Sequence, residues 1–256
     1  MAATAPPSDA ASGELRPHRP LPEYYADEVE HRRFLRRLFD ETAVDYDRVE
    51  RLLALGSGRW YRRQALRRAG LAEGMQVVDV GCGTGLLARE ALALVGARGA
   101  LTGVDPSPGM MGQAHLQGAT LVEGRAEAIP LPAASADFLS LGYALRHIDD
   151  VHAALAEFRR VLRPGGRLLI LEITRPEGAL ARALLKFYMR GVVPLVARLV
   201  ARHADTTRLW RFYWDTIDAC IAPPVLLQAL RDAGFADVRR HVELGIFSEY
   251  TARLPA

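Results

Sequence analysis

The residues with the clearest chemical potential lie in a glycine-rich turn that follows a short apolar run. Val77 to Gly85 reads V-V-D-V-G-C-G-T-G, a strand-like segment that ends in an acid and three alternating glycines. Glycine lets the backbone approach a ligand closely and adopt positive φ values. A helix expected to open at about Leu86 would add unpaired N–H groups and the positive end of its dipole. The segment therefore predicts a strand that feeds a loop for a nucleotide-like cofactor.

The spacing of the glycines indicates which cofactor fits. The dinucleotide fingerprint G-x-G-x-x-G would require glycine at position 86, where this chain has Leu86. A strand ending V-D-V before G-x-G-x-G instead resembles the first motif of the class I S-adenosylmethionine (SAM)-dependent methyltransferases, in which the turn surrounds a carboxylate and a sulfonium. Since a glycine-rich turn alone is a weak signal, a generic turn or another nucleotide fold stays open at this point.

A second acid ends the next apolar run. Leu101 to Asp105 reads L-T-G-V-D and follows the first motif by about twenty residues, the spacing at which such folds capture ribose hydroxyls. Asp105 is a natural bidentate acceptor for a 2′,3′-diol. The other interpretation is that Asp105 simply begins the turn D-P-S-P, because Asp and Pro favour turns whatever the ligand.

A third segment, Thr120 to Pro130, reads T-L-V-E-G-R-A-E-A-I-P and resembles the adenine-binding loop of the same enzymes. Many relatives carry an acid or an amide where this chain has Arg125, so the usual acceptor for the adenine amino group is missing. The backbone of Ala126 or the side chain of Glu127 would then have to serve.

The elements that must position these residues alternate along the chain. Five apolar runs predict strands, at 77–80, at 101–105, within 120–130, at 136–141 and at 167–172. Pro164 is expected to stop a helix, and Gly165 and Gly166 to turn the chain into the fifth strand. A helix over 224–233 and strands near 236–241 and 245–252 close the pattern. This alternation predicts an α/β fold with a mostly parallel, doubly wound sheet and helices on both faces. The resemblance of the first motif implies that this is the Rossmann-like fold of the class I SAM-dependent methyltransferases, with a seven-stranded sheet.

The composition fits one folded domain with no spanning segment. The chain has 256 residues, 50% of them hydrophobic and 25% charged, which is enough to bury a full core. No apolar run reaches the roughly 18 residues of a membrane span, and the Ala/Pro/Ser-rich start lacks the order of a secretory signal. Two cysteines, Cys82 and Cys220, suit a reducing compartment. These features favour a cytoplasmic protein.

Metal, thiol and nucleic-acid chemistry are not favoured. The seven histidines are scattered, and no Cys/His cluster has metal-ligand spacing. Cys82 has no histidine in its local motif, so it is not expected to be a nucleophile. The net charge of +3 is modest, and the arginine runs at 31–37 and 60–68 have the helical spacing of a solvated face. A nucleic acid would require a concentrated basic stripe with exposed aromatic residues.

The chain divides into a tail and one domain. Residues 1–22 carry five prolines among Ala, Ser and Gly and predict a flexible tail. Residues 23–256 are expected to form the methyltransferase domain, with helices from near Tyr25. Its expected parts are N-terminal helices over 23–70 with a break at Gly56 and Gly58, a cofactor half over 75–173, and an amphipathic lid insertion over 175–214.

Four motifs narrow the resemblance to one family. They are A-V-D-Y-D-R-V around Tyr46, G-Y-A-L-R-H-I-D-D around Arg146 and His147, E-F-R-R-V-L-R-P-G-G-R-L-L-I-L-E-I, and V-V-P-L-V-A-R-L-V. Together they resemble the ubiquinone/menaquinone-biosynthesis C-methyltransferases over about residues 40–250. His147 stands where that family has an amide after L-R. This difference and Arg125 leave room for a divergent member with another phenolic or quinol acceptor.

The resemblance implies SAM as the cofactor and assigns residues to each part of it. The glycine turn would hold the methionine end, Asp105 the ribose and the third segment the adenine, with Gly142 lining the cofactor from the end of the fourth strand. The residues implied are Asp79, Gly81, Cys82, Gly83, Thr84, Gly85, Asp105, Pro106, Arg125, Ala126 and Gly142.

The same resemblance implies Arg146 and Tyr46 as catalytic residues. Methyl transfer to an aromatic carbon needs an electron-rich ring, and a quinol becomes electron-rich when its hydroxyl ionises. A guanidinium would hold the resulting phenolate but not abstract the proton, because it stays protonated. His147 or water would take the proton, since an ordinary histidine pKa suits a general base near pH 7. Alternatively, His147 is only a polar residue before a helix capped by Asp149 or Asp150.

A basic, amphipathic helical pair is expected within the insertion. Arg182, Lys186 and Arg190 recur every four residues among Leu and aromatic residues, and Arg198 and Arg202 repeat the interval beyond Pro194. One interpretation is a lid packed on the core with a solvated basic face. The other is a pair that covers the active site and contacts an anionic bilayer through residues 178–202. Assembly into a homodimer also stays open.

Three functions remain open from the sequence. The leading one is a SAM-dependent C-methyltransferase that acts on a small aromatic substrate, a prenylated benzoquinol or naphthoquinol. The second is a methyltransferase of a soluble phenolic metabolite, and the third is a non-catalytic accessory protein with the SAM fold. Intact Asp79, Gly81, Gly83 and Asp105 argue against the third, because a protein without activity has no physical reason to keep the cofactor residues.

Overall fold

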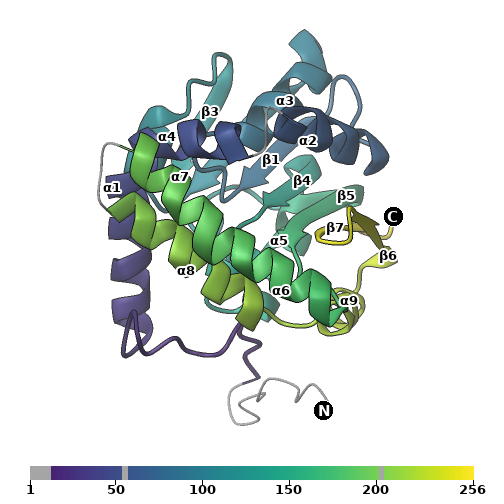
Figure 1. The fold of residues 1–256 in the computed structure, drawn as a ribbon. Helices are drawn as coiled ribbons and strands as arrows, with labels where there is room; N and C mark the ends of the chain where they lie inside the picture. The colour runs from purple at the N-terminus through teal and green to yellow at the C-terminus, as the bar shows by residue number, and fades with distance from the viewer. Residues whose placement is uncertain (1–12, 54–56, 202–204) are drawn as a thin grey trace.

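The structure, a computed structural model that describes residues 13–53, 57–201 and 205–256, is built on a seven-stranded sheet (Figure 1). The strand order is β3-β2-β1-β4-β5-β7-β6. β1 to β5 pair in parallel, whereas β7 runs antiparallel between β5 and β6. The expected α/β fold with a mostly parallel sheet is confirmed. The strands are β1 Gln76–Val80, β2 Ala100–Asp105, β3 Ala119–Glu123, β4 Ala136–Gly142, β5 Leu162–Ile173, β6 Ala236–Glu243 and β7 Phe247–Arg253.

Helices cover both faces of this sheet. α5 and α9 pack against one face, and α2 and α3 against the other. α1, α6, α7 and α8 form a separate apolar cluster of their own. The helices are α1 Glu28–Leu53, α2 Ser57–Arg68, α3 Leu86–Val95, α4 Pro108–Gln113, α5 Val151–Val161, α6 Ala179–Phe187, α7 Val193–Val200, α8 Asp205–Ala219 and α9 Pro223–Asp232.

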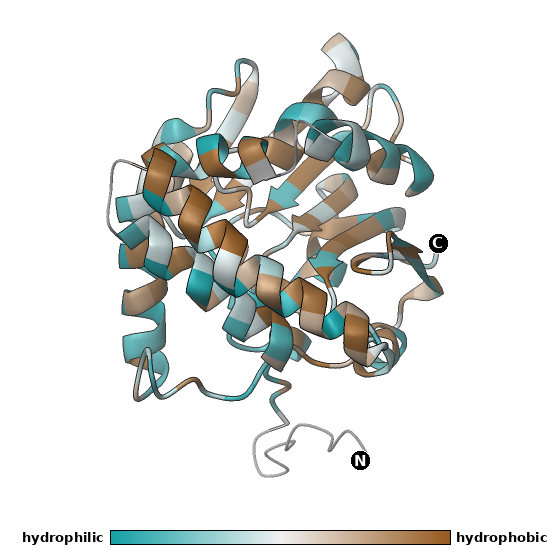
Figure 2. Ribbon diagram, viewed as in Figure 1, coloured by the Kyte–Doolittle hydropathy of each residue, from teal (hydrophilic) through white to brown (hydrophobic). Residues whose placement is uncertain are grey.

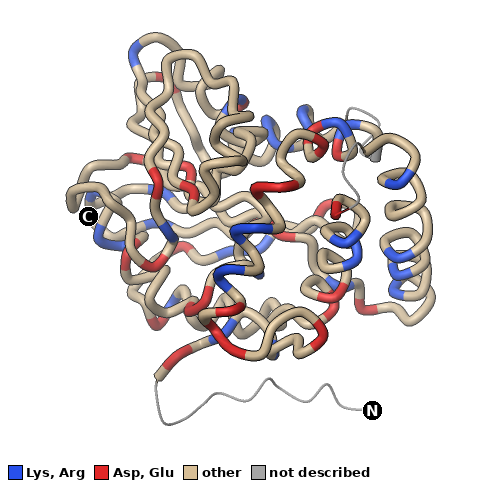
Figure 3. Tube along the Cα trace, turned by 90° about the vertical axis from the view of Figure 1, so that its left-hand side faces the viewer, with Lys and Arg blue, Asp and Glu red and all other residues tan. Residues whose placement is uncertain are grey.

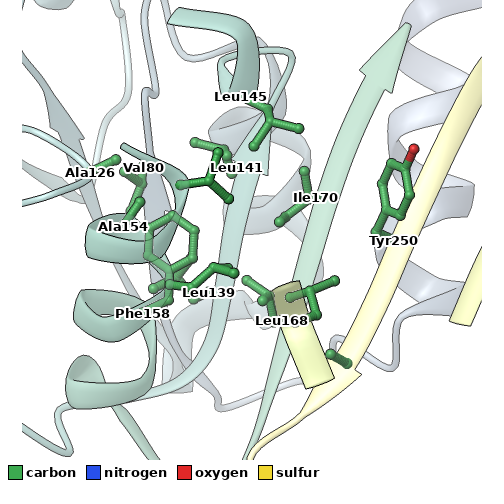
Figure 4. Close-up of a cluster of buried hydrophobic side chains, with 14 of the residues drawn as sticks. Val80, Ala126, Leu139, Leu141, Leu145, Ala154, Phe158, Leu168, Ile170 and Tyr250 are labelled. Atoms are coloured by element: carbon green, nitrogen blue, oxygen red, sulfur yellow. The ribbon is translucent and has the colours of Figure 1, made fainter. Parts of the chain in front are cut away.

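The core explains why the central strands read as nearly continuous apolar runs. Leu139 and Leu168 are buried on one face of the sheet with Phe158 of α5, and Figure 4 shows these side chains grouped between helix and sheet. Phe138 and Leu171 are buried on the opposite face with α3. Because both faces are covered, most side chains on both sides of the central strands are apolar. The central strands are accordingly brown in Figure 2.

The start of β5 differs from the sequence prediction. α5 ends at Val161, three residues before Pro164, and the chain enters β5 at Leu162. Leu162 pairs with Ala136, after which an irregularity shifts the register to the pair of Phe138 with Arg167. Pro164 therefore lies in an irregular strand segment instead of ending the helix. A proline is tolerated there because it lacks only the N–H that a regular ladder would use.

The N-terminal segment is folded onto the domain where it is described. Residues 1–12 of the predicted flexible tail lie outside the described residues. In the remainder of that tail, His18 is buried and forms an isolated β-bridge with Cys220, and the backbone N–H of Leu15 donates to the Asp150 carboxylate at 3.1 Å. The prediction of a flexible tail is therefore wrong for residues 13–22. These long-range contacts left no periodic signal in the proline-rich sequence.

The first helices also differ in their bounds from the prediction. α1 begins at Glu28 rather than near Tyr25, and Gly58 lies inside α2 rather than in a break. Gly56, the other residue of the predicted break, lies outside the described residues.

The first part of the insertion over 175–214 forms a long helix, over residues 179–200, that packs on the outside of α8, and residues 205–214 belong to α8 itself (Figure 1). α6 continues through a π-helical turn at Tyr188–Val192 directly into α7. The wider hydrogen-bonding pattern of a π turn accommodates Pro194, which has no N–H to donate to a regular α-helical bond. The predicted helical pair is therefore one helix with an internal irregularity.

Candidate active site

A cavity of about 660 Å³ lies at the carboxyl ends of β1, β2 and β4. Ligands bind at this edge in open α/β sheets, where the strand order reverses. Most of the residues expected to bind the cofactor line it: Asp79, Gly81, Cys82, Gly83, Thr84, Asp105, Pro106, Arg125, Ala126 and Gly142. Tyr46 and His147 line it as well. Gly85 and Arg146 are absent from the described residues that form its wall.

The turn between β1 and α3 needs its glycines for both backbone shape and space. Gly81, Gly83 and Gly85 all have positive φ values, of 63°, 53° and 80°. A Cβ atom on Gly81 would lie 2.6 Å from the Cβ of Ala144, and one on Gly85 would lie 2.8 Å from Leu116 Cδ1. Glycine is therefore required at Gly85 for the turn and its packing, although this residue does not line the cavity.

Two buried carboxyl groups, those of Asp79 and Asp105, lie beside the glycine-rich turn and give this part of the cavity wall, which we call the cradle, a negative character. Asp79 Oδ1 accepts a hydrogen bond from the Ser140 hydroxyl at 2.6 Å, whereas Asp79 Oδ2 is buried without a partner among the described residues. Asp105 accepts hydrogen bonds from the backbone N–H groups of Gly83 and Ser107, each at 2.8 Å. Burial raises the pKa of Asp79 to about 7 and that of Asp105 to about 6. A cationic or hydroxyl-bearing ligand would supply the missing partners.

Cys82 lines the same cradle but is not activated. Burial raises the pKa of its thiol, and the nearby carboxylates of Asp105 and Asp79 act in the same direction. The thiolate is the reactive form of cysteine, so a raised pKa leaves Cys82 inert.

The adenine loop is held by an ionic network. Arg125 pairs with Asp149 and Glu127, and Asp149 also accepts from Arg32 of α1 at 3.1 Å. Glu127 additionally accepts from the backbone N–H of Asp149. The carboxylate of Glu127 is thus engaged within the protein. Of the two acceptors considered for an adenine amino group, the backbone of Ala126 is the one left for a ligand.

α1 binds both cofactor-holding turns directly, which sequence reasoning missed. Asp40 accepts from the Ser107 hydroxyl at 2.6 Å and from the Gly109 N–H at 2.8 Å, and Asp47 accepts from the hydroxyl of Thr84. Asp40 and Asp47 are seven residues apart and lie on one face of the helix. That spacing is the signal in the sequence that could have revealed this role.

Aromatic residues form the other end of the cavity wall. The hydroxyl groups of Tyr46 and Tyr213 are 2.9 Å apart and share a hydrogen bond, and both residues line the cavity. The ring of His147 lies 5.2 Å from that of Phe39 and 5.5 Å from that of Tyr213, measured between centroids. Tyr213, in α8, was not expected from the sequence. Its only signal is its place in the aromatic run W-R-F-Y-W.

His147 is half-buried in this aromatic wall, with both ring nitrogens buried. Neither ring nitrogen has a hydrogen-bond partner among the described residues. Burial holds the pKa of the imidazole well below its usual value, and the adjacent Arg146 lowers it further. The imidazole is therefore neutral near pH 7, with one donor and one acceptor nitrogen unused.

Arg146 lies behind the cavity wall. Its side chain is completely buried and forms an ion pair with Glu172 of β5, which is 1% exposed. Its guanidinium carbon lies 4.4 Å from the centroid of the Tyr213 ring. The short helical turn Leu145–His147 turns Arg146 toward β5 and leaves His147 at the cavity. The structure therefore does not bring Arg146 to a position where it would touch a phenolate, and Tyr213 lies between them.

Arg62 of α2 is a second buried guanidinium, and this one does line the cavity. It pairs with Glu50 of α1. Sequence reasoning placed it in a solvated arginine run and missed its burial. Helical spacing does not distinguish the one arginine of such a run that faces inward.

The lid expected over 175–214 covers the cavity only through α8. Tyr213 reaches the wall, whereas none of the residues described in α6 and α7 lines the cavity. α1 supplies the cover instead, through Leu35, Phe39 and Tyr46 among others. The expectation that the basic helical pair covers the site is therefore wrong for the described residues of α6 and α7.

The described residues contain neither a candidate membrane span nor a candidate metal site. No helix in this part of the chain is both long and apolar enough to cross a membrane. No group of three or more His, Cys, Asp or Glu residues within 13–53, 57–201 and 205–256 has the arrangement of a metal site.

Comparison with known families and proteins gives consistent matches. The sequence model of the ubiE/COQ5 methyltransferase family matches residues 26–252. The chain is 34% identical over 223 residues to "Ubiquinone/menaquinone biosynthesis C-methyltransferase UbiE" of Syntrophotalea carbinolica, a match that covers 84% of this chain and 92% of that protein. It is 33% identical over 180 residues to the protein of the same name from Hahella chejuensis, covering 67% of this chain and 72% of that protein.

Solved structures match the fold at lower identity. The crystal structure of a SAM-dependent methyltransferase from Aquifex aeolicus superposes with a TM-score of 0.59 at 20% sequence identity. The match covers 81% of this chain and 97% of that chain. At this identity the likeness supports the Rossmann-like class I fold and says nothing of the acceptor.

Proposed function

The chain belongs to the ubiE/COQ5 methyltransferase family, and from that premise we propose that it transfers a methyl group from SAM to a ring carbon of a quinol in quinone biosynthesis. It is a SAM-dependent methyltransferase by family membership. The observation that carries the proposal is the cavity itself, which joins the glycine and carboxylate cradle to the wall of Phe39, Tyr46, His147 and Tyr213. An acceptor ring at this wall would lie beside the cofactor.

The cradle fits SAM. When bound, SAM supplies an electrophilic methyl group on a sulfonium. The free oxygen of Asp79 and the carboxylate of Asp105 suit positive charge and a ribose diol respectively, and the glycine turn leaves room for a ligand against the backbone. The residues that would hold it are Asp79, Gly81, Cys82, Gly83, Thr84, Asp105, Pro106, Arg125, Ala126 and Gly142.

Asp105→Ala should weaken SAM binding by about 30-fold or more, because it removes a charge-assisted hydrogen-bond pair worth about 2 kcal/mol. Titration calorimetry measures this directly. Asp237→Ala is a matched control, since Asp237 lies in β6 and is absent from the described cavity wall. Unchanged affinity in Asp105→Ala would remove the ribose assignment.

SAM binding should release protons between about pH 6 and pH 7. The pKa values of Asp79 and Asp105 are raised to about 7 and about 6, so both groups are partly protonated in this range. A bound cation favours the carboxylates, so affinity should fall as the pH drops below about 7. Calorimetry in two buffers of different ionisation enthalpy counts the protons. Release that persists undiminished at pH 9, where both groups are already ionised, would contradict the assignment.

The tyrosine pair is proposed to bind the acceptor oxygen. Burial raises the pKa of Tyr46 and of Tyr213, so both stay protonated and can donate. One hydroxyl donates to the other, which leaves one proton for a ligand in the cavity. The guanidinium of Arg146 over the Tyr213 ring opposes the raised pKa and makes that hydroxyl a better donor. Arg146 thus acts through Tyr213, as a positioning residue for the phenolate.

His147 is proposed to receive the proton of the acceptor hydroxyl. It lines the cavity, is neutral near pH 7, and has an acceptor nitrogen without a protein partner among the described residues. Buried polar atoms nearly always find a partner, so these nitrogens favour a ligand hydroxyl at this point. Once the proton has moved, the ring oxygen is anionic and the ring carbon is nucleophilic. The bond from this carbon to the methyl group would form as the sulfur–methyl bond breaks, and the hydrogen of the same carbon would leave as a proton to restore aromaticity.

The quinone pool of a host tests the proposal in the cell. Deleting the gene should leave quinones that lack one ring methyl group, and restoring the wild-type gene should return it. A variant with Asp105→Ala should restore it less well. An unchanged quinone pool would move the function to a methyltransferase of a soluble phenol.

A further inference from the structure

The long helix formed by α6, the π turn and α7 lies on the outside of the molecule (Figure 1). One row of its side chains is buried: Leu185, Met189, Val193 and Ala197 recur every four residues and pack into the cluster formed with α1 and α8. This row is sufficient to attach the helix to the domain. The remaining sides of the helix are free to face outward.

A second apolar row lies on the exposed side of the same helix. Its members, which we call the apolar ridge, are Leu180, Leu184, Phe187, Leu195 and Leu199, and they are 75%, 60%, 70%, 59% and 75% exposed. Brown segments run along this helix in Figure 2. Single exposed leucines are ordinary on a protein surface, but five large apolar side chains on one helix are not. One apolar side of this helix packs into the domain, and the other is expected to bind a second apolar surface outside it.

Basic residues accompany the ridge. Residues 178–201 contain Arg182, Lys186, Arg190 and Arg198 and no Asp or Glu. Figure 3 shows blue but no red segments along this helix. Arg182 and Arg190 pair with Asp218 and Asp215 of α8. Lys186 and Arg198 are exposed, and neither has an acidic partner in the part of the chain that the structure describes.

We propose that the apolar ridge binds the surface of an anionic lipid bilayer. The helix would lie in the plane of the interface, with the ridge among the acyl chains and Lys186 and Arg198 at the lipid phosphates. A helix of 22 residues, about 33 Å long, presents enough length for this mode. Phospholipids offer acyl chains to the aliphatic side chains and phosphates to the unpaired basic groups. An apolar groove on another protein would offer only the first of these, so a lipid surface fits the helix better.

This inference serves the proposed function, because a prenylated acceptor resides in the membrane, but its evidence is separate. The ridge does not line the cavity, so it would bring the domain to the acceptor without taking part in the reaction. Membrane binding can therefore be lost while SAM binding stays intact. The two claims can fail independently.

Vesicle co-sedimentation of the full chain tests the ridge. The wild type should sediment with vesicles of equal parts phosphatidylcholine and phosphatidylglycerol. The double variant Leu184→Gln, Phe187→Gln should lower the binding constant by about 10-fold or more, because it removes two inserted apolar side chains. Leu244→Gln is the matched control, since Leu244 is 80% exposed but lies between β6 and β7. It should bind as the wild type does.

A second double variant tests the contribution of the basic residues to vesicle binding. The double variant Lys186→Glu, Arg198→Glu should lower the binding constant for the same vesicles by about 30-fold or more. The reason is that each basic residue near an anionic surface contributes about 1 kcal/mol to binding. The variant should have little effect on vesicles of phosphatidylcholine alone. SAM affinity should equal that of the wild type in every variant, which reports correct folding.

Three results would overturn the proposal. The wild type fails to sediment with anionic vesicles, the ridge variant sediments as the wild type does, or sedimentation velocity shows that the ridge variant converts a lipid-free dimer into monomers. The third would assign the ridge to a second copy of the chain. Failure of the proposed function would look different: no methylation of a short-chain quinol supplied in solution, whatever the protein does on vesicles.

Discussion

Replacing Arg146 with methionine is expected to lower the free energy of unfolding by about 3 to 5 kcal/mol. The substitution leaves Glu172 as a carboxylate that is 1% exposed and has lost its ion-pair partner. Burial already raises the pKa of Glu172, and Arg146 is the main group that opposes this. Urea denaturation followed by circular dichroism measures the change.

Two variants define what Arg146 contributes to this stability. The double variant Arg146→Met, Glu172→Leu should recover most of the loss, because well-packed apolar residues often replace a buried ion pair at little cost. Arg182→Met breaks an ion pair at the surface, between the exposed Arg182 and the half-buried Asp218, and should cost less than about 1 kcal/mol. If Arg146→Met kept its stability and lost only turnover, Arg146 would be a free cationic group in the site and our placement of it would be wrong.

The second large effect is expected from His147→Asn. If His147 receives the proton, turnover should fall by about 100-fold or more. The acid limb of the pH–rate profile should vanish with it. In the wild type that limb should lie at a lower pH than an ordinary histidine would give, because burial and Arg146 hold the pKa of His147 well below its usual value. Below its pKa the imidazole is protonated and cannot accept, so activity is lost as the pH falls.

His31→Gln is the control for this experiment. His31 is buried near the adenine loop and contacts Asp149 at 3.2 Å, but it is absent from the described cavity wall. It should keep the acid limb. A His147→Asn variant with wild-type turnover and an unchanged pH profile would exclude His147 as the base and leave an ordered water in that role.

The cofactor half could be predicted from the sequence because its signals are local. The glycines of the turn between β1 and α3 are dictated by positive φ and by close packing within a few residues of chain. The strands are apolar because helices cover both faces of the sheet. Asp79 and Asp105 follow from the same rule, since polar groups at strand ends in such sheets face the ligand.

The positions of the residues proposed to meet the acceptor could not be predicted in the same way, because they depend on contacts between distant segments. Arg146 and His147 are neighbours in the chain, yet one points to Glu172 and the other to the cavity. The hydrogen bond of Tyr46 with Tyr213 joins residues 167 positions apart. The sequence left open that residues 178–202 contact an anionic bilayer, but its periodicity did not separate the inward apolar row of α6 and α7 from the outward ridge.

The most direct test of the central claim is methyl transfer by the purified protein. The reaction would contain SAM with a deuterated methyl group and a chemically reduced short-chain prenylated quinone that lacks one ring methyl group. We predict that mass spectrometry and NMR will find the label on a ring carbon, with an equal amount of demethylated cofactor formed. Label on the hydroxyl oxygen, or no transfer to any quinol while SAM binds normally, would contradict the account.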